Sequence, residues 1–404
     1  MKHTFRHALC GSVLVTLLAA PLQAAEWISS WTASPLPSAA APGPGPAPLA
    51  LSNQTVRQVL HLSAGGQQLR VRLTNEYGAK PLKVGAATVS RLKADGSVDY
   101  SSTRTLRFGG ETSAIIAVAA PLVSDPIDLP VGALADISLS VYFPEDTGPC
   151  TCHQVGSQEG FVSEAGNFTT GDFTAKQTIQ SRAFVSGVDV QVRRGKTIVV
   201  LGDSISDGVG STRNTNRRWP DVLSRRLNVG GAVWGVANQG ISGNRVLEDG
   251  AGQSALARLD RDVLAVTGAA YLIVFEGVND LGISFGAAAR MKPLNTATSA
   301  LMIAGYRQIL TRAHAQGIKV IAATIAPYEG ASYWSAEGEA QRQAINTWMR
   351  QSGEFDGVLD FDAVLRDPAH PTRIADGLHM GDHLHGSDAG YEAVGQSINL
   401  KLFR

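Results

Sequence analysis

Gly202-Asp203-Ser204 is a segment whose residue types could carry out nucleophilic chemistry. It follows the apolar run Thr197–Leu201, so Ser204 falls on the turn between a predicted buried strand and a helix. At such a turn a serine hydroxyl is exposed beside converging backbone N–H groups. Ser204 is therefore a candidate nucleophile, although a serine at this place can equally cap a helix.

Two Asp-x-x-His pairs lie near the C-terminus, Asp376 with His379 and Asp382 with His385. A spacing of three lets one turn bring the carboxylate to the imidazole. The Asp then orients the ring while the other ring nitrogen takes the serine proton. We favour the second pair, because it lies immediately before the last predicted helix, with Ser387 as its N-cap. A metal site is the competing interpretation, since three His and two Asp occur within ten residues.

Two further segments supply hydrogen-bond donors after neighbouring strands. Gly243 follows the apolar run Val233–Asn238 and leaves a backbone N–H unshielded. Asn279 follows Tyr271–Phe275 and offers a side-chain amide. Each of the two is by itself an ordinary turn residue. If both donors converge on Ser204, they would form an oxyanion hole.

The second half of the chain has the pattern of a parallel α/β domain. Short apolar runs alternate with helical patterns after Gly195, and the residues Met302, Tyr306, Ile309, Leu310 and Ala313 share one helix face. This pattern predicts a parallel sheet covered on both faces, with its site at the carboxyl ends of the strands. The expected strands are Thr197–Leu201, Val233–Asn238, Tyr271–Phe275, Lys319–Ile325 and Val358–Phe361, and the last helix runs over about 388–400.

The first half of the chain alternates with period two from about Thr55 to Val192. Leu69, Val71 and Leu73, for example, are separated by polar residues, and Gly and Pro punctuate the runs. This predicts an all-β sandwich or jelly-roll-like domain. Before it, residues 34–50 form a Pro/Ala-rich segment that we expect to be extended and exposed.

The N-terminus has the order of a secretory signal peptide. Lys2 and Arg6 precede the uncharged apolar run Leu9–Leu18, and small residues follow it. We expect cleavage near Ala24 and a secreted or periplasmic protein without stable membrane insertion. The predicted organisation is a signal peptide over 1–24, a β-sandwich domain over 25–192 and an α/β domain over 196–404.

Charge and composition exclude several classes of protein. The chain of 404 residues carries 35 Lys and Arg against 35 Asp and Glu, so no excess of positive charge favours a nucleic-acid partner. With 44% hydrophobic and 17% charged residues the chain is not disordered. Loss of Lys2 and Arg6 with the signal peptide leaves 33 basic and 35 acidic residues. A net charge of −2 gives no charge field that would steer a polyanion to the protein.

Cys150 and Cys152 are the cysteines that remain after signal cleavage, because Cys10 is removed. An exported protein reaches an oxidising compartment, where the two residues can form a bond. The sequence leaves two alternatives open, a local disulfide or two inert thiols.

The motifs taken together resemble the four sequence blocks of the SGNH (GDSL) hydrolases. The matching residues stand in family order over about 196–404, and they are Gly202-Asp203-Ser204-Ile205, Gly243, Gly277-Val278-Asn279-Asp280 and Asp382-x-x-His385. Within that family the chain is similar to an exported, two-domain group related to xylan-cluster acylhydrolases and arylesterases.

The resemblance implies a flavodoxin-like, three-layer α/β/α fold and a role for each matching residue. Ser204 is the expected nucleophile, His385 the general base and Asp382 the residue that orients it. The Ser204 N–H, the Gly243 N–H and the Asn279 side chain are the expected oxyanion hole. No metal or other cofactor is implied.

Two departures from the family pattern affect neighbouring positions. Gly386 stands where relatives usually have Pro, which we expect to loosen the approach to His385. Glu276 replaces a Gly, which we expect to make the edge of the pocket narrower or more acidic.

The sequence therefore predicts a serine esterase that acts through an acyl-serine intermediate on small-molecule or polysaccharide esters. The expected substrates are O-acetylated carbohydrate of the xylan type and short-chain aryl esters. The alternatives are a lysophospholipase or other lipid esterase, a non-catalytic carbohydrate-binding protein, and a metal-dependent hydrolase that uses His379, Asp382 and His383. The oligomeric state is not predicted.

Overall fold

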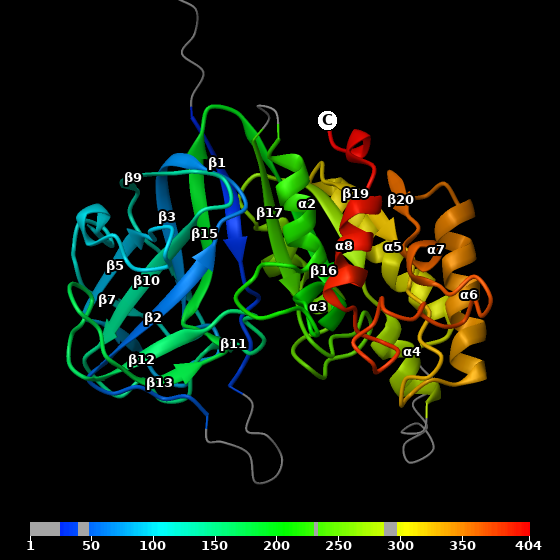
Figure 1. Ribbon diagram of the computed structural model, residues 1–404, viewed down its shortest axis with the longest axis horizontal. Helices are drawn as coiled ribbons and strands as arrows, with labels where there is room; N and C mark the ends of the chain where they lie inside the picture. The colour runs from blue at the N-terminus through cyan, green and yellow to red at the C-terminus, as the bar shows by residue number, and fades with distance from the viewer. Residues whose placement is uncertain (1–24, 39–47, 230–232, 287–296) are drawn as a thin grey trace, which may run out of the picture.

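The computed structural model describes residues 25–38, 48–229, 233–286 and 297–404, which form an N-terminal β module and a C-terminal α/β module (Figure 1). The signal peptide predicted for residues 1–24 lies outside the described residues, as do residues 39–47 of the Pro/Ala-rich segment. Within the described ranges, none of the helices has the length and apolar character needed to cross a membrane.

The β module is a sandwich of two antiparallel sheets, which confirms the fold class expected from the alternation. One sheet has the order β1-β15-β3-β8, with β9 also paired to β3, and the other has the order β13-β12-β2-β10-β5-β6. Leu69, Val71 and Leu73 of β3 are buried in the core between them. The strands are β1 (Glu26–Thr32), β2 (Gln54–His61), β3 (Gly66–Thr74), β4 (Leu82–Val84), β5 (Ala86–Arg91), β6 (Arg104–Thr105), β7 (Ala114–Ile116), β8 (Pro121–Val123), β9 (Ile127–Val131), β10 (Asp136–Phe143), β11 (Cys152–His153), β12 (Gly160–Ala165), β13 (Ala175–Ile179), β14 (Arg182–Ala183) and β15 (Val185–Val192).

The sandwich begins earlier than the periodicity indicated, because β1 precedes the alternating region by more than twenty residues. β1 pairs with β15 on one side and packs against β17 of the α/β module on the other. Its residues from Ile28 to Trp31 are all buried. A strand buried on both faces has no polar side to alternate, so the period-two signal is missing.

The α/β module contains a parallel sheet of five strands in the order β17-β16-β18-β19-β20. This is the flavodoxin-like order, in which the first strand lies between the second and the third. The strands are β16 (Gly195–Gly202), β17 (Val233–Gly240), β18 (Ala269–Phe275), β19 (Lys319–Ala323) and β20 (Gly357–Leu359). The predicted three-layer α/β/α fold is therefore confirmed.

The helices of this module pack in two groups that cover the sheet (Figure 1). α2, α7 and α8 contact one another, whereas α3, α4, α5 and α6 form a second connected set. The helices are α1 (Ser204–Asp207), α2 (Trp219–Leu227), α3 (Ala255–Leu259), α4 (Val278–Phe285), α5 (Ser299–Ala315), α6 (Ala336–Gln351), α7 (Phe361–Leu365) and α8 (Asp388–Ser397), with a π-helical turn at Asp260–Leu264 after α3 and a 3₁₀ turn at Leu400–Leu402.

Three of the predicted elements extended two or three residues too far at their carboxyl ends. β19 ends at Ala323 and not at Ile325, whose backbone N–H donates to the Asn346 side chain of α6 at 2.8 Å. β20 ends at Leu359, because Asp360 caps the helix α7 that begins at Phe361. α8 ends at Ser397, after which the backbone becomes extended. In each case the helix or strand ends where a side-chain hydrogen bond or a change of backbone conformation interrupts it, and not where the sequence pattern ends.

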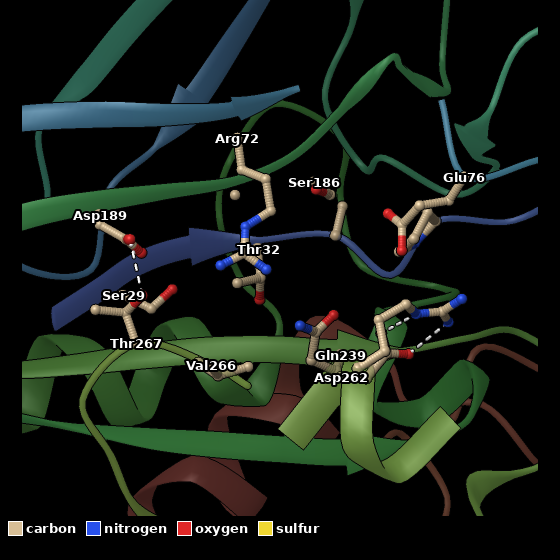
Figure 2. A pocket seen from close by; sticks show the side chains of 14 residues that line it. Ser29, Thr32, Arg72, Glu76, Ser186, Asp189, Gln239, Asp262, Val266 and Thr267 are labelled. Carbon is tan, nitrogen blue, oxygen red and sulfur yellow. Dashed lines mark hydrogen bonds and ion pairs between the residues drawn. The ribbon is translucent and has the colours of Figure 1, made fainter. Parts of the chain in front are cut away.

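The two modules meet along β1 through close polar contacts. The Ser29 N–H donates to the Thr267 carbonyl at 3.0 Å, and the Val236 N–H donates to Ser63 Oγ at 2.9 Å. Figure 2 shows a small polar pocket at this junction, where Thr267 Oγ1 donates to Asp189 Oδ2 at 2.8 Å. Because main-chain and side-chain groups of both modules bond one another at the junction, we treat the modules as one folded unit.

Gly235 of β17 offers a test of this junction. A Cβ at Gly235 would lie 2.0 Å from the main-chain oxygen of Ser29, so one strand would have to move. We expect Gly235→Ala to destabilise the protein by about 1–3 kcal/mol, as overpacking usually does. Thermal unfolding would measure the change. Gly132→Ala is the matched control, because its added Cβ would have no neighbouring atom within 4 Å. An equal loss of stability in both variants would contradict tight packing at Gly235.

Candidate active site

Ser204 is the first residue of α1 and sits directly beyond the end of β16. Asp203, and not Ser204, is the N-cap of this helix, since its carboxylate accepts from the Ile205 N–H at 2.9 Å. The preceding Gly202 is required by space, because a Cβ there would lie 2.3 Å from Ser206 Oγ. The hydroxyl of Ser204 is therefore not needed for capping and is free to meet a base.

The structure brings Ser204, His385 and Asp382 together in one hydrogen-bonded chain. His385 Nε2 lies 2.8 Å from Ser204 Oγ, and His385 Nδ1 lies 2.6 Å from Asp382 Oδ2. A carboxylate can only accept, so Nδ1 carries a proton and donates to Asp382, while Nε2 accepts from the serine hydroxyl. This is the tautomer that a general base needs.

The turn at Asp382 holds the imidazole in place. Asp382 Oδ1 accepts from the backbone N–H groups of Leu384 and His385, each at 3.0 Å. Partial burial opposes ionisation of Asp382, but the hydrogen bonds from the His385 ring and from these N–H groups outweigh it and lower its pKa. Asp382 is thus held as a carboxylate in the orientation that fixes the ring.

The first Asp-x-x-His pair does not join this chain. Asp376 is fully exposed, and its carboxylate is 3.9 Å from His379 Nε2. His379 Nδ1 instead accepts from the backbone N–H groups of Gly381 and His383 at 3.0 and 3.3 Å. His379 therefore shapes the loop that carries His385. Across the described part of the chain, no group of three or more His, Cys, Asp or Glu side chains is arranged to hold a metal ion.

Gly243 and Asn279 lie at the same edge of the sheet as Ser204. In the parallel register Gly202 is the partner of Gly240 and of Phe275, so the loops after the three strands begin side by side. Gly243 has a φ of +80°, and the Asn244 N–H donates to the Ile241 carbonyl at 3.0 Å. This is the pattern of a type II turn, whose closing bond leaves the N–H of its third residue, here Gly243, unused.

The side-chain amide of Asn279 is oriented by two neighbours. Its Nδ2 donates to the Asn244 carbonyl at 2.9 Å, and its Oδ1 accepts from the Tyr333 hydroxyl at 3.2 Å. An amide nitrogen carries two hydrogens, so one remains for a ligand. Asn279 also ties the third loop of the site to the loop that contains Gly243.

Arg258 is a structural element of the site that the sequence analysis missed. It is fully buried, and its guanidinium donates to the carbonyls of Gln239 and Gly202 at 2.6 and 3.0 Å and to Asn244 Oδ1 at 3.0 Å. It therefore fixes the ends of β16 and β17 together. The only sequence signal is an arginine within the short amphipathic segment Ala255–Leu259, which is indistinguishable from a surface residue.

The two departures from the family pattern act differently from what we expected. A Cβ at Gly386 would lie 2.8 Å from the ring of Tyr391 in α8, so this ring occupies the space that a side chain at position 386 would need. The backbone of Gly386 also forms a β-bridge with His379. The segment after His385 is therefore packed and not loose. Glu276 is fully buried beside Arg258, at 3.6 Å, so it does not line the edge of a pocket.

A parallel α/β/α sheet with a hydrogen-bonded serine, imidazole and carboxylate at its carboxyl edge is typical of serine hydrolases. Residues 200–393, slightly less than half of the chain, match the model of the GDSL-like lipase/acylhydrolase family. The α/β module belongs to this family, and the family assignment supports an ester hydrolase.

Several solved structures are similar to this half of the chain. A lipase/acylhydrolase from Enterococcus faecalis is 20% identical, covers 50% of this chain and 92% of its own, and gives a TM-score of 0.39. The acetyl xylan esterase AlAXEase is 19% identical over 50% and 96%, with a TM-score of 0.38. The M. smegmatis aryl esterase is 17% identical over 50% and 96%, with a TM-score of 0.39. No curated protein matches the chain.

Glu276 generates a prediction about stability and pH. Burial raises its pKa well above the ordinary value of 4.5, and the Asp203 carboxyl raises it further, although Arg258 opposes the shift. Above pH 4.5 the unfolded chain releases this proton while the folded protein keeps it, so stability falls as pH rises. We expect Glu276→Gln to raise the unfolding temperature at pH 8 and to change it little at pH 4.5, measured by calorimetry.

Glu354 is the matched control for this experiment. Its pKa is lowered to about 2 by hydrogen bonds from Arg307 and Trp348, so its contribution to stability is present above pH 4.5 and lost in acid. Because the pair is exposed, Glu354→Gln should lower the unfolding temperature only slightly at pH 8. A Glu276→Gln variant that is less stable than the parent at pH 8 would contradict a proton held at Glu276.

Proposed function

We propose that this protein is an exported serine esterase that hydrolyses carboxylic esters through an acyl-Ser204 intermediate. The observation that carries the proposal is the hydrogen-bonded chain from Ser204 Oγ through His385 to Asp382, at 2.8 and 2.6 Å. Such a chain activates a hydroxyl that is otherwise a weak nucleophile.

In the first half of the reaction Ser204 Oγ attacks the ester carbonyl carbon, and its proton passes to His385 Nε2. The carbonyl oxygen becomes an oxyanion, which accepts from the N–H groups of Ser204 and Gly243 and from the Asn279 amide. The resulting imidazolium is stabilised by Asp382. Collapse of the tetrahedral adduct breaks the bond to the leaving alcohol, which takes the proton from His385.

In the second half a water molecule replaces the alcohol. His385 Nε2 accepts a proton from this water, and the hydroxide attacks the acyl carbon of the acyl-Ser204 ester. The same donors hold the second oxyanion. When the adduct collapses, Ser204 Oγ leaves and recovers its proton from His385, and the carboxylic acid is released. The protein returns to its starting state without a cofactor.

A small hollow lies next to Ser242, the residue directly before Gly243. It measures about 240 Å³, also borders Asp207 and is walled by apolar side chains from both modules, among them Leu36, Val155 and Ala251. Sites for drug-sized ligands usually measure about 300–1,000 Å³, so this hollow fits a small group. Together with the low net charge, it supports acetyl esters of neutral carbohydrate and short aryl esters as substrates.

The proposal of export rests on residues 1–24 and on the cysteines of the β module. The charged, apolar and small-residue segments of 1–24 stand in the order of a signal peptide. Cys150 and Cys152 form a disulfide, which fits an oxidising compartment. These two features support a secreted or periplasmic location.

Ser204→Ala tests the reaction. We expect turnover of p-nitrophenyl acetate to fall by about 10³-fold or more, since the nucleophile is lost. Ser211→Ala is the matched control, because Ser211 lies on the loop after α1 and its hydroxyl donates to the Gly208 carbonyl. Release of acetate from acetylated xylan should also be lost in Ser204→Ala and kept in Ser211→Ala. Faster turnover of long-chain or lysophospholipid esters would contradict the proposed substrate class.

Asp382→Asn and Asp376→Asn test the assignment of the carboxylate. An amide at position 382 has one oxygen and no negative charge, so it cannot accept from both the His385 ring and the backbone as the carboxylate does. The His385 ring then loses its fixed orientation, and its protonated form loses a stabilising charge. We expect kcat to fall by about 10²–10⁴-fold in Asp382→Asn and to stay within about twofold in Asp376→Asn, measured with p-nitrophenyl acetate. A larger loss of kcat in Asp376→Asn than in Asp382→Asn would contradict the assignment and would indicate that Asp376 orients the base.

A further inference from the structure

His153 belongs to the β module, yet it reaches the helix that begins with the proposed nucleophile. It ends the short strand β11, and its Nε2 lies 2.9 Å from Oδ1 of Asp207, the last residue of α1. Both side chains are buried, with 7% and 4% of their surface exposed. Asp207 stands three residues after Ser204, so the β module contacts the α/β module one helical turn from the nucleophile.

The second oxygen of Asp207 holds the loop of the proposed oxyanion hole. Asp207 Oδ2 accepts from the Ser242 N–H at 3.0 Å and from Ser242 Oγ at 2.7 Å. Ser242 is the second residue of the type II turn, directly before Gly243. A continuous chain of hydrogen bonds therefore runs from His153 through Asp207 to Ser242, the residue directly before the peptide that presents the Gly243 N–H.

The partners of the His153 ring show that it is charged. Nδ1 lies 3.0 Å from the main-chain oxygen of Ser34, which can only accept, and Nε2 faces the Asp207 carboxylate, which also accepts. Both nitrogens must then donate, which requires the imidazolium. Burial and nearby Arg182 oppose this charge, but the attraction of Asp207 outweighs them and raises the pKa of His153.

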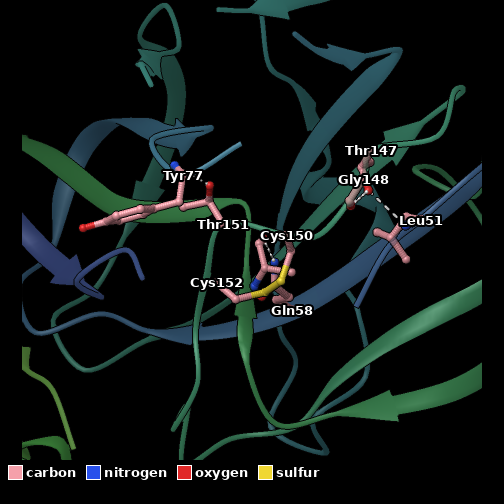
Figure 3. The surroundings of a disulfide bond; sticks show 9 residues. Leu51, Gln58, Tyr77, Thr147, Gly148, Cys150, Thr151 and Cys152 are labelled. Carbon is pink, nitrogen blue, oxygen red and sulfur yellow. Dashed lines mark hydrogen bonds between the residues drawn. A yellow bond between two sulfur atoms is a disulfide. The ribbon is translucent and has the colours of Figure 1, made fainter. Parts of the chain in front are cut away.

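The segment that carries His153 is fixed on three sides. The disulfide between Cys150 and Cys152 closes the loop directly before it (Figure 3). Cys152 exchanges two backbone hydrogen bonds with Leu36, at 3.0 and 3.1 Å, and β11 pairs with β14. These contacts leave the imidazolium little freedom to move away from Asp207.

A buried carboxylate needs such a partner. Removing one member of a buried ion pair leaves an uncompensated charge, whose cost is large. Without His153, Asp207 would keep the hydrogen bonds from Ser242 and the more distant charge of Arg218, and its side chain would have to shift or admit water. Each of these changes alters the bonds that hold Ser242.

We propose that His153 is a positioning residue of the esterase. It fixes Asp207, so that Asp207 holds Ser242 and thereby orients the following peptide, whose Gly243 N–H binds the oxyanion. The proposal rests on the proposed function in so far as Gly243 binds the oxyanion. It gives the β module a defined part in catalysis, because the module supplies a charge that the α/β module uses.

The test compares His153→Ala and His153→Gln with the parent protein on p-nitrophenyl acetate. An oxyanion donor acts mainly in the transition state, so kcat should fall while KM stays within about twofold. We expect a loss of about 10- to 100-fold for Ala and a smaller loss for Gln, whose amide can still donate to Asp207. The Gln variant also keeps the test valid if Ala does not fold.

His61→Gln is the matched control. His61 forms a similar but more exposed pair with Asp136 at 2.7 Å, with 13% and 37% of the side chains exposed, and both residues lie within the β module. We expect this variant to keep kcat within about twofold. An equal loss in His61→Gln and His153→Gln, or a loss that falls on KM alone, would overturn the positioning role, because either result indicates general destabilisation or altered substrate binding.

Amide hydrogen exchange over residues 241–244 provides a readout that does not depend on activity. We expect faster exchange in His153→Ala than in the parent and no change in His61→Gln. Unchanged exchange and unchanged kcat in His153→Ala would overturn the inference even if the parent is an active esterase. If the parent hydrolyses no ester, the proposed function is wrong, and the exchange result alone decides whether His153 positions the loop.

Discussion

The hydrogen bond between His385 Nε2 and Ser204 Oγ is the contact on which the site depends, and it joins residues 181 positions apart. It forms only if β16 delivers Ser204 to the edge of the sheet and the segment before α8 returns to the same edge. Tyr391 of α8 helps to fix that return, because its ring packs on Gly386 and its hydroxyl donates to the Val209 carbonyl of the loop after α1. The last helix is thereby locked to the first loop of the domain.

The parallel register explains why much of the site could be read from the sequence. Each candidate residue follows a buried apolar strand within a few positions, and parallel strands end at one edge, so local motifs become neighbours in space. Ser204, Gly243 and Asn279 follow this rule. The choice of Asp382 over Asp376 also came from local order, since only the second pair directly precedes the helix that Ser387 caps. Strand ends were less predictable, because side chains such as Asp360 and Asn346 set them.

Residues that act from a distance left no such local signal. Arg258 and His153 are each surrounded in sequence by residues that give no sign of their partners, and their importance comes from burial that only the folded chain creates. β1 was missed for a related reason, because a strand buried between two modules shows neither polar alternation nor a motif. Sequence patterns describe periodicity and near neighbours, whereas these features depend on contacts between separate segments, which lie 54 positions apart in the His153–Asp207 pair.

The His153–Asp207 pair also changes how the two modules relate to one another. Hydrogen bonds along β1 join the modules through main-chain groups, which fix position but carry no net charge. The ion pair adds a constraint of a different kind, since a buried carboxylate and a buried imidazolium each require the other. Folding of the β module against the α/β module is then coupled to the state of Asp207, and through Ser242 to the turn at Gly243. In the proposed mechanism, packing between the modules becomes part of the geometry of the reaction, because the charge that orders the proposed oxyanion loop comes from the module that contains neither Ser204 nor His385.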